Sequence, residues 1–168
     1  MSVLGELQPN KVFKYFEEIC SIPHGSRNLQ QISDYLVDFA KAHELKYRQD
    51  EDLNVIIWKD GSKGYEASEP VILQGHMDMV AVKEADCDKD MEKEGLDLEI
   101  NGDYISAKGT SLGGDDGIAV AYTLAVLDDE EMAHPPIEAI FTVNEEIGML
   151  GAATIDLSLI HISEPTRH

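Results

Sequence analysis

Apolar side chains recur at helical spacing in two stretches near the beginning of the chain. One stretch covers residues 10–20, and the other runs from Asn28 to His43. Asn28 and Gln31 resemble a capping box, in which each side chain accepts a backbone N–H at the start of a helix. The spacing predicts two amphipathic helices, separated by a break at Pro23 and Gly25.

Short apolar runs bounded by turn residues predict the strands. These candidate strands are Leu53–Trp58, Val71–Gln74, residues 98–100, residues 104–106 and Ile137–Val143. Asn101-Gly102 is typical of a hairpin turn, and Gly117–Leu127 is almost wholly apolar, which indicates a buried helix. Strands that alternate with helices predict an α/β domain with a mixed sheet flanked by helices on both faces.

The composition is that of a soluble globular domain. The 168 residues are 43% hydrophobic and 27% charged, and no apolar run reaches the ~18 residues of a membrane helix. A formal net charge of −20 argues against nucleic acid as a partner, because phosphate binding needs clustered Lys and Arg. No secretory signal is visible, and Cys20 and Cys87 form neither a disulfide framework nor a metal motif. We therefore expect a reducing, cytoplasmic compartment.

Acidic residues dominate the second half of the chain, where no Lys or Arg occurs between Lys108 and Arg167. We expect most of these acids to form a solvated surface and some to converge on cations, which would offset their repulsion. A separate acidic run, Asp86–Asp97, alternates like a calcium loop. Met91 stands where such a loop needs glycine, so this run is interpreted as a solvated loop.

Three polar clusters could each bind a metal, and each also has a plain structural interpretation. His76 ends a predicted strand and could bind a metal while Asp78 accepts its other ring N–H, but a lone strand-end His is more often structural. Asp115 and Asp116 lie in a glycine-rich turn before the apolar helix, where Asp116 could be an N-cap. Two adjacent carboxylates without a Lys favour a cation there over a phosphate.

The third cluster is the pair Glu145 and Glu146, directly after the last predicted strand. A charged loop is the plain interpretation; alternatively, one carboxylate binds metal and its neighbour acts as general base. Together, a strand-end His, an Asp in a glycine turn and a Glu after a strand are the ligand types of a two-metal hydrolase.

With these three clusters, the sequence resembles a known family, the dizinc metallopeptidases. The three segments that resemble its N-terminal motifs, in the same order, are His76-Met77-Asp78, Gly114-Asp115-Asp116-Gly117 and Glu145-Glu146-Ile147-Gly148. Further segments resemble the aminoacylhistidine dipeptidase branch of the family, namely Ile19–His24, Leu73–Val80 and Lys108–Gly113. The resemblance runs from about Leu7 to Asp156 and implies a zinc aminopeptidase-like catalytic domain, truncated in this chain.

The resemblance implies a role for each motif residue. His76 would bind the first metal, Glu146 would bind the second, and Asp115 would bridge both. Asp78 would orient His76. Glu145 would be the general base that activates a metal-bridging water and later protonates the leaving amine. The cofactors would be two Zn²⁺ ions, for which Co²⁺ or Mn²⁺ could substitute.

Two details of the glycine-rich turn follow from the same resemblance. Relatives hold a cis peptide bond directly after the bridging Asp, so we expect one between Asp115 and Asp116. Asp116 stands where many relatives have Asn, which adds a charge beside the site.

The resemblance also implies parts that the matching segment lacks: an acidic ligand, a late His and a lid-like domain. We therefore expect residues 1–156 to form a partial catalytic domain that is inactive by itself. Residues 157–168 resemble the translation of a sequencing-library adapter. We expect an artefactual tail there, in which His161 and His168 are not ligands.

These observations predict a cytoplasmic, metal-dependent hydrolase of dipeptides, Xaa-His and broader, acting on small peptides without nucleic acid or membrane. The full-length protein could be a homodimer. Two alternatives stay open. One is a tripeptidase or amino-acid deacylase of the same family, and the other is an acidic, non-catalytic metal-binding module.

Overall fold

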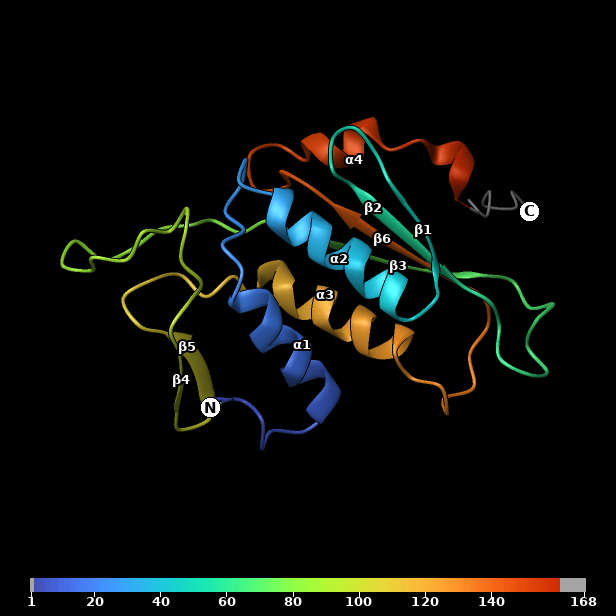
Figure 1. Ribbon diagram of the computed structural model, residues 1–168, viewed down its shortest axis with the longest axis horizontal. Coiled ribbons are helices and arrows are strands. Elements are labelled where there is room, and N and C mark those ends of the chain that lie inside the picture. The colour runs from blue at the N-terminus through green and yellow to red at the C-terminus, as the bar shows by residue number, and fades with distance from the viewer. Residues whose placement is uncertain (1, 161–168) are drawn as a thin grey trace, which may run out of the picture.

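The computed structural model describes residues 2–160. Its strands form a four-stranded sheet in the order β1-β2-β6-β3 and a separate two-stranded sheet of β4 and β5 (Figure 1). The strands are β1 (Lys46–Gln49), β2 (Val55–Lys59), β3 (Val71–His76), β4 (Leu98–Asn101), β5 (Tyr104–Ala107) and β6 (Ile137–Thr142). The helices are α1 (Asn10–Cys20), α2 (Gln30–Ala42), α3 (Gly114–Leu127), α4 (Leu150–Thr154) and the short 3₁₀ helix η1 (Leu157–Leu159).

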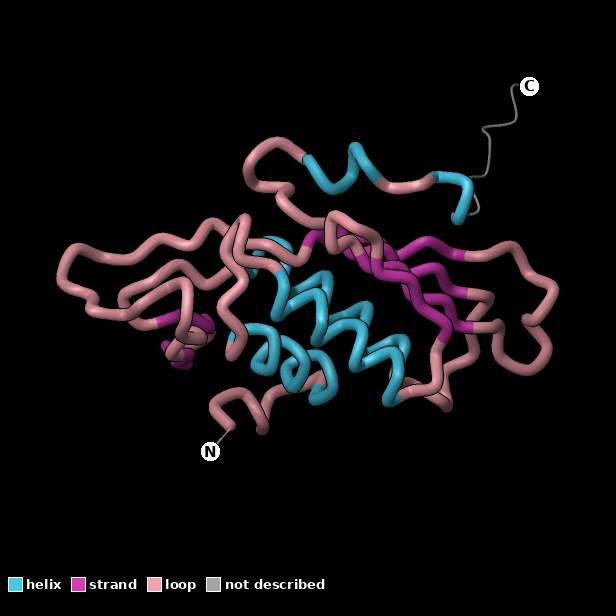
Figure 2. The backbone as a smooth tube through the Cα atoms, turned by 45° about the horizontal axis from the view of Figure 1, so that its top comes forward, coloured by secondary structure: helices cyan, strands magenta, loops and turns pink. Residues whose placement is uncertain are grey.

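The main sheet is mixed, as predicted. β2 pairs antiparallel with β1 and β6, whereas β3 pairs parallel with β6. The helices α1, α2 and α3 lie on one face of this sheet, and the short α4 lies on the opposite face (Figure 2). The predicted class, an α/β domain with helices on both faces, is confirmed.

The apolar core lies between the sheet and the three long helices. Alternate residues of β2 and β6 point into it, as the period of two along a strand requires. Its largest fully buried members include Ile19, Ile32, Leu36, Ile57, Leu124 and Phe141. The helical periodicity of the sequence therefore identified the buried faces of α1 and α2 correctly.

The local structure departs from the sequence analysis at one strand and at one helix cap. Strand β1 was missed, because its four residues, Lys-Tyr-Arg-Gln, show no apolar alternation and become a strand only by pairing with β2. The capping box does not form: the N-cap of α2 is Leu29, and the Asn28 side chain donates to the carbonyl of Glu92. The predicted hairpin is confirmed, with its turn one residue later than expected: Asn101 pairs with Tyr104, so Gly102 and the residue after it make the turn.

No helix in the described part of the chain is long and apolar enough to cross a membrane. Cys20 and Cys87 are both free thiols, and Cys20 is buried. His161 and His168 lie outside the described residues, so the prediction that they are not ligands stays a prediction.

Candidate metal centre

Two of the three motifs meet because β3 and β6 are parallel neighbours. His76 is the last residue of β3 and is in register with Thr142, the last residue of β6. The chain therefore leaves both strands at the same edge of the sheet, where ligands gather in open α/β folds. His76-Met77-Asp78 begins at the end of β3. Glu145 and Glu146 follow β6 after two intervening residues.

The third motif reaches this edge through α3, which packs against β3. A Cβ atom at Gly75 would lie 3.1 Å from Asp116 Oδ2 and 3.5 Å from the side chain of Ala119. The missing side chain at Gly75 thus lets the beginning of α3 approach the end of β3. Asp115 and Asp116 have non-helical backbone angles, and the peptide bond between them is cis, as the family resemblance implied.

His76 is the centre of the resulting cluster, and its side chain is 8% exposed. Its Nδ1 lies 3.0 Å from the backbone carbonyl of Asp78, and its Nε2 lies 3.1 Å from Asp115 Oδ1. Glu145 Oε2 is 3.7 Å from the same Nε2. Because the carbonyl can only accept, Nδ1 carries a proton and Nε2 faces two carboxylates.

The predicted convergence of the three motifs is confirmed. His76, Asp115 and Glu146 each offer one ligand atom, and these atoms all lie within 4.8 Å of one another. Among the described residues this is the sole group of three or more such side chains arranged to hold an ion. In the acidic run Asp86–Asp97, by contrast, Asp90 and Asp97 pair with lysines.

Asp78 lies beneath the cluster and is 1% exposed. Its Oδ1 accepts the backbone N–H of Glu145 at 3.0 Å, and its Oδ2 accepts that of Glu146 at 3.3 Å. Ser26 Oγ donates to Oδ2 at 2.8 Å. The two carboxylate oxygens thus accept three hydrogen bonds from two segments that are distant in sequence.

Hydrogen bonding outweighs burial in setting the pKa values of His76 and Asp78, whereas burial prevails at Asp116. Burial by itself would lower the pKa of His76, but its hydrogen bonds to Asp78 and Asp115 raise that pKa to about 9. Burial would raise the pKa of Asp78, but the donors of His76, Glu145 and Ser26 lower it to about 2. The pKa of Asp116 is raised, chiefly by burial.

Asp116 takes a role that sequence reasoning did not assign. Its Oδ2 accepts the backbone N–H of His76 at 3.3 Å, so the side chain bridges back to β3 rather than capping α3. Ser26 was also missed, because it lies 52 residues from Asp78 and no spacing rule links them. Arg27 adds a second link from that segment, since its N–H donates to Asn144 Oδ1 at 2.9 Å.

The donor set fits a zinc-like cation. One imidazole and two carboxylates are ligands that Zn²⁺ accepts, and a ligating His usually donates its other ring N–H to a carbonyl or carboxylate, as His76 does to Asp78. An Nε2 lone pair that faces Asp115 and Glu145 needs either a proton or a cation between them. The residues present therefore suit a metal at the position that a proton holds in the metal-free chain.

A hollow adjoins the cluster and has both polar and apolar lining residues. The polar ones include His76, Asp115, Asp116 and Glu145, and the apolar ones are Ile140, Met149, Ala152, Ile155, Leu157 and Ile160. A small ligand with both polar and apolar groups would fit such a lining.

Known proteins are similar to this chain in both sequence and fold. Over 152 residues the chain is 41% identical to cytosol non-specific dipeptidase of Escherichia coli K12, a match that covers 90% of this chain. The crystal structure of aminoacylhistidine dipeptidase from Vibrio alginolyticus matches with a TM-score of 0.88 and 39% identity over 91% of this chain. A tripeptidase from Staphylococcus aureus shares the fold, with a TM-score of 0.75 and 24% identity over 94% of this chain and 42% of its own. No family model matches the chain.

Fold and sequence similarity together define the class: the chain belongs to a family of peptidases, as the motif resemblance predicted. Within that family it is similar to cytosol non-specific dipeptidase and to aminoacylhistidine dipeptidase. The chain spans 31% of the length of each of these two relatives.

Proposed function

We propose that the protein to which this chain belongs hydrolyses dipeptides, Xaa-His among them, in a metal-dependent reaction. The observation that carries the proposal is the grouping of His76, Asp115 and Glu146, with the Glu145 carboxylate beside them. His76 and Asp115 would hold one Zn²⁺, and Asp115 and Glu146 would hold a second. When bound, the ions would polarise the scissile carbonyl and make water acidic enough to attack it near neutral pH.

In this proposal, Glu145 would be the residue that moves the proton. Its side chain is 38% exposed, and its Oε2 lies on the ligand side of His76, 3.7 Å from Nε2. The carboxylate would take a proton from the attacking water as the C–O bond forms. It would return that proton to the amine nitrogen as the C–N bond breaks.

Asp78 and Asp116 would hold the ligand residues and Glu145 in position. Asp78 holds the His76 ring through Nδ1 and the two glutamates through their backbone N–H groups. Asp116 holds the backbone of His76 and leaves Asp115, whose side chain is 88% exposed, free to face the hollow. Neither carboxylate would need to change protonation during turnover.

The substrate class and the compartment are part of the same proposal. The names of the two relatives specify dipeptides, and one of them specifies the cytosol. Two free thiols accord with a reducing, cytoplasmic location. A homodimer, the absence of nucleic-acid partners and Co²⁺ or Mn²⁺ as substitute metals stay predictions.

A chimera tests the proposal in a whole protein. The 152 residues of this chain that match the Escherichia coli dipeptidase would replace their counterparts in that protein. We expect zinc-dependent hydrolysis of dipeptides, and a 10²- to 10⁴-fold loss of kcat in Glu145→Gln with the zinc content unchanged, about the range of general acid–base catalysis. Glu131→Gln, an exposed acid on the loop after α3, is the matched control.

The alternatives give different results in the same assay. Preferential turnover of tripeptides or N-acyl amino acids would indicate the tripeptidase or deacylase alternative. Full zinc uptake with no turnover of any of these substrates would favour the non-catalytic metal-binding module.

A further inference from the structure

The two proposed catalytic glutamates lie on a loop whose ends are joined. This loop, residues 143–151, leaves β6 and returns at the start of α4. The N–H of Gly151 donates to the carbonyl of Val143 at 2.9 Å, and that of Leu150 donates to the carbonyl of Asn144 at 3.2 Å. Asp78 holds the middle of the loop, so the position of the glutamates depends also on what holds its base.

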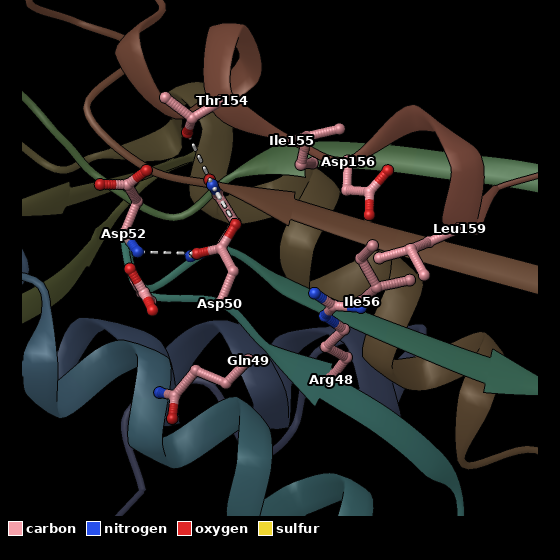
Figure 3. Close-up of a pocket in the computed structure, with 11 residues that line it drawn as sticks. Arg48, Gln49, Asp50, Asp52, Ile56, Thr154, Ile155, Asp156 and Leu159 are labelled. Carbon is pink, nitrogen blue, oxygen red and sulfur yellow. Dashed lines mark hydrogen bonds between the residues drawn. The ribbon is translucent and has the colours of Figure 1, made fainter.

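Asn54 lies at that base and is 1% exposed. Its Oδ1 accepts the N–H of Val143 at 3.1 Å, and its Nδ2 donates to the carbonyl of Gly151 at 3.2 Å. One side-chain amide thus contacts both ends of the loop. Its Nδ2 also donates to Thr154 Oγ1 in α4 at 3.4 Å, an interaction drawn as a dashed line from Thr154 in Figure 3.

The position of Asn54 follows from the sheet register. The last residue pair between β2 and β6 is Val55 with Phe141, so the backbone ladder stops before Val143. Asn54 directly precedes β2, and its side-chain oxygen supplies the acceptor that the ladder no longer provides. A buried N–H at this point would otherwise lack a partner.

Asp50 sets the orientation of the amide. Its Oδ2 accepts Asn54 Nδ2 at 2.8 Å, and its Oδ1 accepts the backbone N–H groups of Asn54 and Asp52 (Figure 3). Because a carboxylate can only accept, Nδ2 must face Asp50, and Oδ1 is left to face Val143.

Gly151 completes the base of the loop. A Cβ atom there would collide with Oδ1 of Asn54 and with the backbone N and O of Val143. The close approach of α4 to the end of β6 therefore needs glycine at this position.

We propose that Asn54 is a positioning residue, which fixes both ends of the 143–151 loop so that Glu145 and Glu146 face His76 and Asp115. Its effect on metal binding rests on the proposed function, because it acts through Glu146 as a ligand. Its effect on the loop itself is independent of any metal.

Asn54→Asp in the 168-residue chain is the principal test. The change keeps the size and an acceptor for Val143, but it removes the donor and brings a second carboxylate against Asp50. In metal-free protein we expect faster amide hydrogen exchange over residues 144–151. With Co²⁺, measured by competition against a chelator, we expect affinity to fall about tenfold, the lower end of what outer partners of metal sites contribute.

Two controls separate positioning from general destabilisation. Asn101→Asp makes the same chemical change at an exposed hairpin residue and should alter neither readout. Ile57→Ala removes a fully buried β2 side chain of the helix-facing core, so it should lower the unfolding midpoint without loosening the loop selectively. Gly151→Ala should reproduce the effects of Asn54→Asp, and the double variant should show less than their sum.

Each outcome decides a separate point. Loop exchange in Asn54→Asp no faster than in Ile57→Ala would overturn the proposal, as would unchanged Co²⁺ affinity despite a loosened loop. If the parent chain takes up no Co²⁺, the affinities are measured in the chimera with the Escherichia coli dipeptidase, where absence of Co²⁺ binding would overturn the proposed metal centre; loop exchange by itself then decides the role of Asn54. If Asn54→Asp does not fold, the milder Asp50→Asn, which leaves Asn54 in place but weakens its orientation, is measured in the same way.

Discussion

The carboxylate of Asp78 accepts the backbone N–H of Glu145 at 3.0 Å, across 67 residues of sequence. The same carboxylate accepts the N–H of Glu146, and the backbone carbonyl of Asp78 contacts His76. One buried residue therefore orients an imidazole from one motif and two glutamates from another. Asp78, two residues after the strand-end His, is therefore linked to a loop far along the chain.

Replacing Asp78 with Asn should weaken metal binding far more than it weakens the fold. An amide keeps one acceptor oxygen for two N–H groups, and its NH₂ faces donors, so the glutamates lose their common anchor. We expect a 10- to 100-fold lower Co²⁺ affinity, about the effect typical of outer partners of metal ligands. Chelator competition measures it, and Asp103→Asn in the exposed hairpin turn is the control. Equal affinities in the two variants would contradict the role of Asp78.

His24 should make the fold sensitive to mild acid. It is 3% exposed, and burial lowers its pKa below the ordinary value of 6.5, although a bond to the carbonyl of Ile22 and the Asp78 charge oppose the shift. In the unfolded chain His24 takes up a proton near pH 6.5, whereas in the folded chain it stays neutral at that pH. Stability is therefore complete above this pH and falls below it, until the lowered folded pKa is passed.

The measurement is urea unfolding at about pH 7.5 and about pH 5, on the parent chain and on His24→Gln, which cannot titrate. We expect the parent to lose more free energy of unfolding than the variant between the two values. If His24→Gln loses as much free energy of unfolding as the parent between these pH values, the pH dependence of stability comes from other groups.

Glu17 should anchor the beginning of the chain. Its carboxylate accepts Ser2 Oγ at 2.6 Å and the N–H groups of Val3 at 2.6 Å and Leu4 at 3.2 Å, and Leu4 is fully buried. Burial would raise the pKa of Glu17, but these donors lower it. We expect Glu17→Ala to reduce the free energy of unfolding by about 1–2 kcal/mol, against no change in Glu6→Ala, by urea denaturation.

The 168-residue chain by itself should hydrolyse no dipeptide. Its described residues bring together three ligand side chains, whereas two catalytic zinc ions commonly take about three protein ligands each. The purified chain would be assayed with Zn²⁺, Co²⁺ and Mn²⁺ against a dipeptide panel. Turnover above that of a Glu145→Ala variant would contradict this expectation.

Local patterns in the sequence determined the elements and the motif residues. Helical spacing located α1 and α2, apolar runs located β2, β3 and β6, and the three motifs named the residues that now lie together. These features are readable because periodicity and motif spacing depend on neighbours within a few residues.

Tertiary structure decided everything that depends on partners far along the chain. Strand β1 exists because β2 pairs with it, and Asn28 leaves its expected cap to bond the carbonyl of Glu92. Asn54 contacts Val143 across 89 residues, and no pattern within a strand or helix encodes that contact. The sequence therefore determined which side chains could carry chemistry. The parallel pairing of β3 with β6, and the approach of α3 at Gly75, decided that they meet, because only packing brings such distant segments within hydrogen-bonding distance.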